Sequence, residues 1–158
     1  MLSQEKILVV EDNELNRTML VEILSGQYAT LEAENGQAAL NILQTHTDDV
    51  ALILLDIVMP VMDGYTFLDI LKKDSQLSLI PVIIMTQNAS EDAEVAALSH
   101  GATDFIPKPY RPQVILHRVA SIIHLRETAS MINQFRYDQL TGLYSKEFFY
   151  QQAQAVLM

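Results

Sequence analysis

Acidic side chains that could bind a cation follow two short apolar runs of the sequence. Glu11 and Asp12 come directly after residues 7–10, and Asp56 comes directly after residues 51–55. If these runs are strands of one parallel sheet, their ends bring the three carboxylates to one rim, where like charges repel. Carboxylate oxygens are hard ligands of the kind that Mg²⁺ accepts. We therefore predict that these acids form a Mg²⁺ site.

A hydroxyl group and an ammonium group follow two further apolar runs. Thr86 comes after residues 81–85, and Lys108 comes after residues 104–106 within a Pro-Lys-Pro sequence. A carboxylate that attacks phosphorus needs a metal and a fixed cation to stabilise charge on the transferring oxygens, and it needs donors for the product phosphate. Taken together, these residue types predict phosphoryl transfer to a carboxylate.

The elements that must position these groups alternate in type. Short apolar runs take turns with longer amphipathic segments from Lys6 to about Pro112, a rhythm typical of a parallel sheet with helices on both faces. Joined by right-handed crossovers, such elements form a doubly wound α/β fold that binds ligands beyond the carboxyl ends of its strands. The predicted strands are 7–10, 29–33, 51–55, 81–85 and 104–106, and the predicted helices are 13–25, 36–45, 64–74, 91–99 and 112–135.

The first predicted helix has an apolar stripe and a glycine at its end. We expect Gly26 to take a left-handed conformation that ends the helix. Its core-facing residues are predicted to be Leu15, Met19, Leu20, Ile23 and Leu24.

Charge and composition exclude several classes of function. Ten Lys and Arg residues against twenty Asp and Glu residues give a net charge of −10, which disfavours nucleic acids and anionic membrane surfaces as partners. No apolar run approaches the roughly 20 residues of a membrane span, and the first residues do not resemble a signal peptide. The chain contains no cysteine. We expect a cytoplasmic protein that binds neither nucleic acid nor membrane.

Four segments of the chain resemble the receiver domain of bacterial two-component response regulators, a CheY-like domain. They are VVEDNE, LLDIVMPVMDG, VIIMT and GATDFIPKPY, and the resemblance covers about residues 4–125. It implies a flavodoxin-like five-stranded parallel sheet in the order 2-1-3-4-5. It also implies phosphoryl transfer from a histidine kinase or a phosphotransfer protein to an aspartate.

The resemblance assigns a role to each residue of the predicted site. Asp56 would be the phosphoacceptor, and Glu11, Asp12, Asp56 and the backbone carbonyl of Val58 would hold Mg²⁺. Thr86 and Lys108 would bind the phosphate, and Phe105 would be the aromatic residue that responds to it. The family also implies a cis peptide bond between Lys108 and Pro109.

A switching mechanism follows from these roles. A phosphoryl group carries nearly two negative charges, so it would draw the Thr86 hydroxyl inward and open space for the Phe105 ring. The alternative is that Phe105 is an ordinary core aromatic. The family usually has a small residue after the threonine, whereas this chain has Gln87 followed by Asn88. We expect these amides to alter the rates of phosphorylation and dephosphorylation.

The last predicted helix is longer than the sheet requires. Ile122, Leu125, Ala129 and Ile132 continue at spacings of three and four residues, as in a coiled-coil seam. We interpret this stripe as a surface for a homodimer. The alternative is that it packs on the chain's own sheet or tail.

The tail resembles the opening of GGDEF domains, the diguanylate cyclase module. The resemblance lies in Asp138-Gln-Leu-Thr-Gly-Leu, although Ser145-Lys146 stands where Asn-Arg is common. We expect a receiver domain at 1–125, a helical linker at 126–137 and the start of a GGDEF-like output domain at 138–158. Its catalytic signature would lie beyond Met158, so we expect no enzymatic activity from this sequence and treat it as a piece of a longer protein.

Three other functions compete with a phosphorylated receiver that switches an output module. The intact protein could be an enzyme that synthesises cyclic di-GMP, with these residues as its regulator. A flavin-binding module shares the strand order, but the acidic sequence from Glu11 to Glu14 would repel a flavin phosphate. A receiver-like scaffold without phosphorylation is the third, which the complete set of site residues disfavours.

Overall fold

The computed structural model describes residues 5–59, 61–87 and 90–125. The chain divides into two units, Met1–Val119 and Ala120–Met158, and the sheet lies in the first. A last helix spans 112–125 of the described residues, and its predicted continuation to residue 135 lies outside them. The other elements are β1 (Lys6–Val10), α1 (Glu14–Ser25), β2 (Ala29–Ala33), α2 (Gly36–Thr45), β3 (Val50–Asp56), α3 (Gly64–Lys73), the short 3₁₀ helix η2 (Leu77–Leu79), β4 (Val82–Thr86), α4 (Glu91–Ser99) and β5 (Asp104–Pro107).

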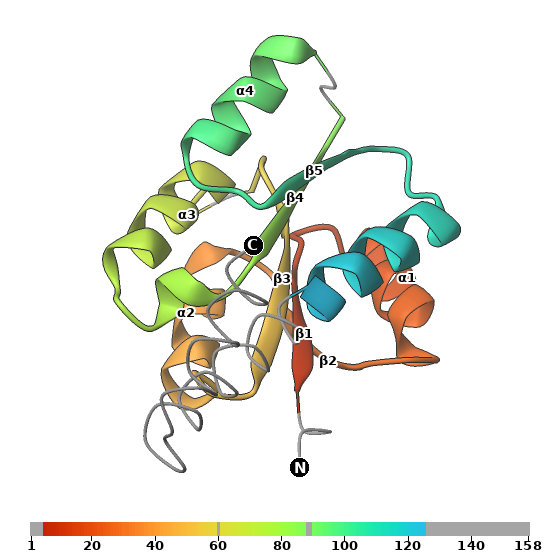
Figure 1. Ribbon diagram of the computed structural model, residues 1–158, viewed down its shortest axis with the longest axis horizontal. Coiled ribbons are helices and arrows are strands. Elements are labelled where there is room, and N and C mark those ends of the chain that lie inside the picture. Colours follow the sequence, from red (N-terminus) through yellow and green to blue (C-terminus); the bar gives the residue numbers. More distant parts are fainter. Residues whose placement is uncertain (1–4, 60, 88–89, 126–158) are drawn as a thin grey trace, which may run out of the picture. The chain divides into compact units, whose positions relative to one another are not determined.

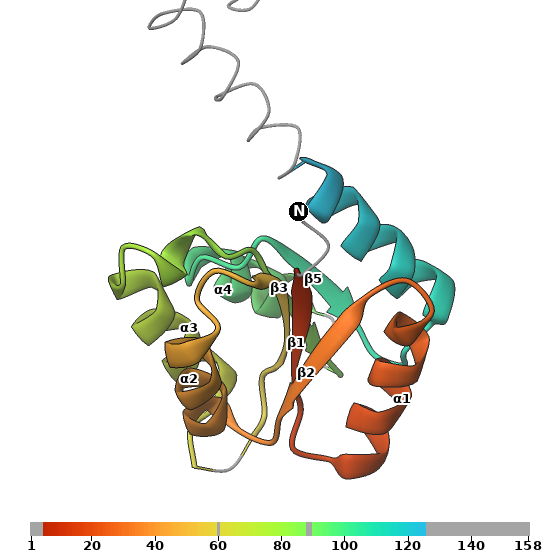
Figure 2. The same ribbon diagram turned by 90° about the horizontal axis from the view of Figure 1, so that it is seen from below.

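The five strands form one parallel sheet in the order β2-β1-β3-β4-β5, which confirms the predicted fold (Figure 1). Helices cover both faces, with α1 and residues 112–119 of the last helix on one side and α2, α3 and α4 on the other (Figure 2). All seven residues of β3 are buried. A strand covered on both faces needs a continuous apolar run, which explains the sequence of this segment.

The strand register brings the predicted site residues to one rim of the sheet. Val10, the last residue of β1, pairs with Leu55 of β3, and Asp56 pairs with Met85 of β4. Thr86 pairs in turn with Pro107 of β5. Residues that directly follow these strands therefore emerge beside one another, as expected for a parallel sheet.

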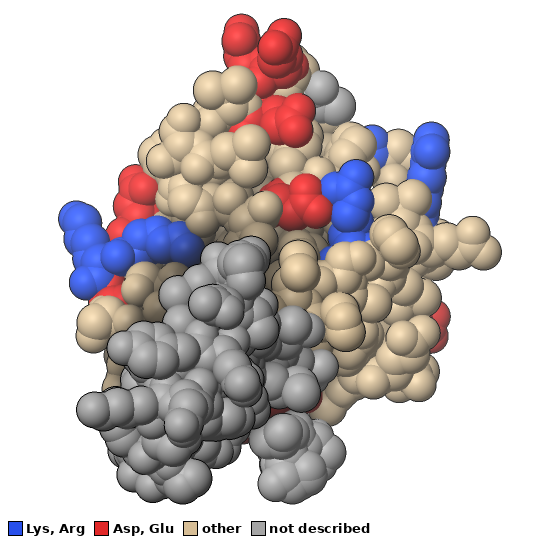
Figure 3. Space-filling view, viewed as in Figure 1, with Lys and Arg blue, Asp and Glu red and all other residues tan. Residues whose placement is uncertain are grey.

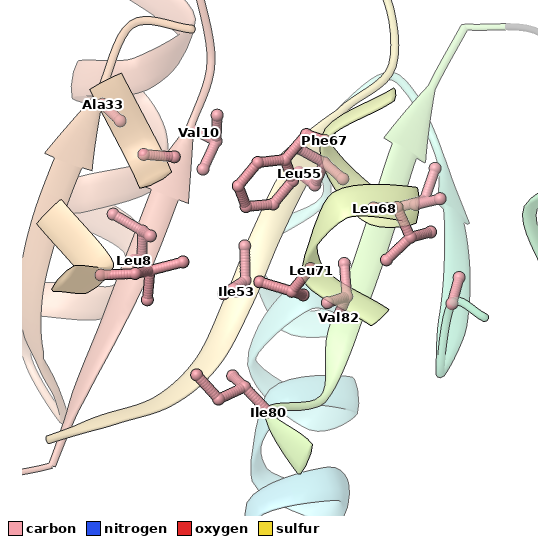
Figure 4. Close-up of a cluster of buried hydrophobic side chains, with 14 of the residues drawn as sticks. Leu8, Val10, Ala33, Ile53, Leu55, Phe67, Leu68, Leu71, Ile80 and Val82 are labelled. Carbon is pink, nitrogen blue, oxygen red and sulfur yellow. The ribbon is translucent and has the colours of Figure 1, made fainter. Parts of the chain in front are cut away.

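The core between the sheet and α3 holds these strands in place. Figure 4 shows apolar side chains from β1, β3, β4 and α3 gathered in one cluster. Phe67 and Leu71 of α3 and Leu55 of β3 are fully buried there. Removing a large side chain from such a cluster costs about 2–5 kcal/mol, so this packing contributes strongly to holding the strands in place.

Four helices begin with a side-chain cap directly after a strand and its loop. In each case a side-chain oxygen accepts a hydrogen bond from the backbone N–H three residues later, which satisfies a donor that the helix leaves unpaired. This arrangement lets the chain turn sharply from each strand into its helix. The capping residues are Asn13 for α1, Asn35 for α2, Asp63 for α3 and Ser90 for α4.

Acidic side chains gather at the start of α4, at one end of the view in Figure 3. Glu91, Asp92 and Glu94 lie in its first turn. Negative charge stabilises the N-terminus of a helix, so these residues favour the helix as well as contributing to the acidic surface. Among the described residues, no helix is long and apolar enough to cross a membrane.

The predicted buried face of α1 was wrong in part. Leu20 and Leu24 are fully buried, whereas Leu15 is 72% exposed and Met19 is 40% exposed. An α-helix turns by about 100° per residue, so Leu15 and Leu24 lie on opposite sides of it. Ile23 is half-buried. The five predicted residues therefore spread over more of the helix surface than the face that is buried.

The predicted left-handed conformation of Gly26 was also wrong. This residue is right-handed, with φ −70° and ψ −20°. The backbone N–H groups of Gln27 and Tyr28 both donate to the Leu24 carbonyl, at 3.0 and 2.9 Å. These bonds satisfy the end of α1, so no left-handed residue is needed there.

Candidate functional site

Three carboxylates meet at the rim of the sheet. Oxygens of Glu11, Asp12 and Asp56 all lie within 4.8 Å of one another. Glu11 is 1% exposed and Asp56 is 4% exposed, whereas Asp12 is exposed. The three carboxylates therefore lie close together at one rim of the sheet, as predicted. Three residues with hard oxygen donors, one of them exposed to solvent, suit a Mg²⁺ ion that keeps several of its waters.

Lys108 is the cation closest to these acids among the described residues. Its Nζ lies 3.2 Å from Asp56 Oδ1 and 3.6 Å from Glu11 Oε1. The peptide bond between Lys108 and Pro109 is cis, as the family resemblance implies. The backbone N–H of Lys108 donates to the Thr86 carbonyl at 2.7 Å. The Lys108 ammonium group therefore lies in contact with Asp56, the predicted phosphoacceptor.

The other predicted residues lie around this centre. Thr86 and Phe105 are buried, each at 8% exposure, near the ends of β4 and β5. Gln87 is exposed directly after Thr86, and Asn88 lies outside the described residues. The Val58 side chain is 76% exposed in the loop after β3, and the role of its carbonyl stays a prediction.

The loop between β3 and α3 brings backbone very close to Asp56. The Gly64 N–H donates to the Ile57 carbonyl at 2.8 Å and closes the loop. A Cβ atom on Gly64 would lie 2.6 Å from the Asp56 carbonyl oxygen, so only glycine fits there. Val61, at the exposed tip of the loop, has φ 69°, which is strained for a β-branched residue.

Two residues of the site were missed by the sequence analysis. The Tyr110 hydroxyl donates to Glu11 Oε1 at 2.6 Å, and its ring lies 5.5 Å from Lys108 Nζ. Arg17 of α1 donates to the Glu11 carbonyl at 2.8 Å and pairs with Glu32 of β2 at 3.3 Å. The position of Tyr110, two residues after Lys108 at the same strand end, could have indicated its place.

The electrostatics of the site disfavour an ionised acceptor when no cation is bound. Burial, and next the charge of Glu11, raise the pKa of Asp56 from 3.8 to about 6, while Lys108 opposes this shift. The costs of burial and of like charges are the two causes expected for such a cluster. A divalent cation would relieve the repulsion between the like charges.

This shift predicts how stability depends on pH without a cation. The pKa of Asp56 in the folded protein is above its unfolded value, so the folded state is less easily ionised than the unfolded one. Stability is therefore lost as the pH rises from about 4 to about 6. With a chelator present, we compare the free energy of unfolding of the parent with that of an Asp56→Asn variant. We expect this difference to change by about 1 kcal/mol in favour of the parent as the pH falls from about 7 to about 5. Urea unfolding at both pH values measures this; a constant difference would contradict the raised pKa.

An acidic rim with a lysine, on a parallel sheet of this order, defines a class of phosphoryl-accepting signalling domains. The chain matches the response regulator receiver domain family over residues 7–120. It therefore belongs to that family, and receiver domains of two-component systems are phosphorylated on an aspartate.

Known proteins similar to this chain agree with the family. The phosphate regulon transcriptional regulatory protein PhoB of Escherichia coli is 35% identical over 119 residues, which cover 75% of this chain and 51% of PhoB. The chain spans between 8% and 56% of the length of the curated relatives it matches, which include histidine kinases. Activities of those whole proteins are thus not activities of the matched part alone.

Solved structures show the same fold. A "probable two-component system response regulator/GGDEF domain protein" has a TM-score of 0.73 and 26% identity, over 80% of this chain and 52% of that one. A chain of the CheX-CheY-BeF₃-Mg²⁺ complex from Borrelia burgdorferi has a TM-score of 0.68 and 29% identity, over 75% of this chain and 88% of that one.

Proposed function

We propose that Asp56 accepts a phosphoryl group from a histidine kinase or a phosphotransfer protein, and that this event switches an output module. The observation that carries the proposal is the 3.2 Å contact between Lys108 Nζ and Asp56 Oδ1 inside a cluster of three carboxylates. Receiver domains interact with histidine kinases or phosphotransfer proteins, so the donor class follows from the family.

In the proposed reaction a carboxylate oxygen of Asp56 attacks the phosphorus of a phosphohistidine. The new O–P bond forms as the N–P bond breaks, and the electron pair of that bond stays on the histidine nitrogen. The Lys108 ammonium lies beside the attacking oxygen, where it stabilises negative charge on the transferring oxygens. Thr86 supplies a hydroxyl group for the product from the end of β4.

We assign Glu11, Asp12, Asp56 and the Val58 carbonyl to a Mg²⁺ ion. The donor set supports this, because its carboxylate oxygens are hard ligands that lie within 4.8 Å of one another. The bound ion would supply charge neutralisation between the carboxylates and the incoming phosphoryl group. The similar CheY of Borrelia burgdorferi was solved as a complex with BeF₃ and Mg²⁺, which agrees with such a site.

The proposed switch connects Thr86 to Phe105 through adjacent strands. Phe105 pairs with Ile84, two residues before Thr86, and both side chains are buried. A phosphoryl group on Asp56 would attract the Thr86 hydroxyl, and the Phe105 ring would then repack at the surface of β4 and β5. Such a change provides the altered surface that an output module needs.

Gln87 is expected to affect how long the phosphorylated state lasts. Its exposed side chain directly follows Thr86, at the carboxyl end of β4. A Gln87→Ala variant gives water easier access, so we expect its phosphorylated form to decay several-fold faster than that of the parent. Intact-mass measurements over time after removal of the phosphodonor give the two lifetimes. Equal lifetimes would exclude a role for this side chain.

We propose a GGDEF-like output domain that begins at residues 138–158, after a receiver at 1–125 and a linker at 126–137. The similarity to a response regulator that carries a GGDEF domain supports this order of domains. Cyclic di-GMP synthesis would then belong to the longer protein. Turnover of GTP by the present 158 residues would contradict the proposal that catalysis needs more of a GGDEF-like domain than residues 138–158.

We also propose that the last helix mediates a homodimer. Ile122 and Leu125 of the expected seam are half-buried and 66% exposed, respectively, whereas Ala129 and Ile132 lie outside the described residues. An exposed leucine at this spacing is consistent with a partner helix. Sedimentation at high concentration, with and without beryllofluoride, tests the proposal; a monomer in both conditions would remove it.

The proposed function is tested by incubation with acetyl phosphate and Mg²⁺, followed by intact-mass measurement. Gain of a single phosphoryl group, lost in alkali, is the expected result. A receiver-like scaffold that works without phosphorylation is the competing function, and it predicts no gain of mass under any of these conditions.

A further inference from the structure

We propose that Tyr110 is a positioning residue of the acidic site. Its hydroxyl group holds Glu11 in the orientation that a cation needs, and it keeps the Lys108 ammonium directed at Asp56. The inference rests on the proposed Mg²⁺ site, because it assigns a further residue to the control of that site. It concerns the hydroxyl group and not the aromatic ring.

The first argument is that both oxygens of a buried carboxylate are already occupied. Glu11 is 1% exposed, and its Oε1 accepts from the Tyr110 hydroxyl at 2.6 Å. Its Oε2 accepts from the backbone N–H of Asn13 at 3.2 Å. Two donors from different parts of the chain fix the plane of the carboxylate, so Glu11 is oriented before any cation arrives. Hydrogen bonds of this kind around metal ligands strongly affect metal affinity.

The second argument concerns the position of the Lys108 ammonium group between two acids. Its Nζ is 3.6 Å from Glu11 Oε1, beyond a good hydrogen bond, and 3.2 Å from Asp56 Oδ1. The Tyr110 hydroxyl already donates to that Glu11 oxygen. Without it, Glu11 Oε1 would be a buried carboxylate oxygen that has lost its hydrogen-bond donor, and the Lys108 ammonium, 3.6 Å away, is a group able to replace it. Lys108 would then move from Asp56 toward Glu11 and compete with the cation.

The hydroxyl group is suited to this role because an ionised carboxylate oxygen can only accept hydrogen bonds, and the Tyr110 O–H is a donor 2.6 Å from Glu11 Oε1. The ring makes a separate contact, 5.5 Å from Lys108 Nζ, which a phenylalanine would keep. A Tyr110→Phe variant thus removes the donor alone.

The test measures Mg²⁺ affinity directly. Calorimetric titration with Mg²⁺ alone is carried out on the parent, on Tyr110→Phe, and on Tyr65→Phe as the matched control. Tyr65 lies in α3 with its ring against His100, so its variant loses a tyrosine hydroxyl away from the acids. We expect Tyr110→Phe to bind Mg²⁺ about 10-fold more weakly than the parent, as for other groups that hydrogen-bond to metal ligands. The control should bind as the parent does.

A second measurement separates positioning from general damage to the structure. The rate of phosphorylation by acetyl phosphate is measured at limiting and at saturating Mg²⁺. We expect Tyr110→Phe to be slower only at limiting Mg²⁺, because excess cation displaces Lys108 from Glu11. A rate that stays equally low at saturating Mg²⁺ would show a structural defect and overturn the proposal, as would an unchanged or tighter Mg²⁺ affinity. If the parent itself binds no Mg²⁺, the proposed metal site fails, which is a different result from failure of Tyr110 alone.

Discussion

An Asp56→Asn variant is expected to gain no mass when it is incubated with acetyl phosphate and Mg²⁺, whereas the parent gains one phosphoryl group. The amide of asparagine is a poor nucleophile, and it does not carry the negative charge that pairs with Lys108 at 3.2 Å. Asp56 is also buried, and its carboxylate lies closer to this ammonium than that of Glu11 does, at 3.2 Å against 3.6 Å. Phosphorylation should fall to the background of the assay.

The matched control for this experiment is Asp48→Asn. Asp48 is exposed in the segment that precedes β3, at the opposite end of the strand from Asp56. It has the same chemistry without the surroundings of the site, so this variant should be phosphorylated as the parent is. If Asp56→Asn still gained a phosphoryl group, the acceptor would be another residue and the proposed function would need a different site.

A Gly64→Ala variant is expected to lose about 2 kcal/mol of stability, the middle of the range for forcing extra volume into a packed site. The added Cβ would lie 2.6 Å from the Asp56 carbonyl oxygen and 2.9 Å from Ile57 Cα. Both are backbone atoms, so neither can turn away as a side chain would. The loop that follows the phosphoacceptor must shift instead. Urea unfolding gives the free energy of unfolding for the parent and the variant.

Gly26→Ala is the control for the effect of replacing a glycine. Apart from the residue itself and its two neighbours in the chain, no atom lies within 4 Å of the Cβ that it would carry, and its backbone is right-handed. Alanine fits this conformation and restricts the unfolded chain, so we expect stability to be unchanged or higher by about 0.5 kcal/mol. A loss in this variant as large as in Gly64→Ala would show that close approach to Asp56 is not the cause.

Much of the fold and of the site can be predicted from sequence because short apolar runs are strong indicators in a doubly wound protein. The run from Ala51 to Leu55 is typical of a strand buried on both faces, and the acid that follows such a strand emerges at its carboxyl end. The same reasoning places Glu11 and Thr86 at this rim. The chemistry of the site therefore follows from the order of strands and the residues after them.

The features that escaped prediction depend on details of packing. Tyr110 reaches Glu11 across 99 positions of the chain, and no local pattern identifies the acceptor of a hydroxyl group. Leu15 is apolar but exposed, because helical spacing permits two faces and only the sheet decides which is covered. Gly26 is right-handed because the amides that follow it satisfy the end of α1. In each case the deciding partner is distant or is part of the backbone.

The hydrogen bond from the Lys108 N–H to the Thr86 carbonyl joins two phosphate-binding candidates through main-chain atoms. Their spacing is thus a property of the scaffold and not of the side chains they carry. Exchanging either side chain for another would leave the distance between the two anchoring points as it is. Side chains at this rim can therefore be exchanged to alter reactivity while the backbone stays the same, which makes the rim a convenient place for engineering signalling lifetimes.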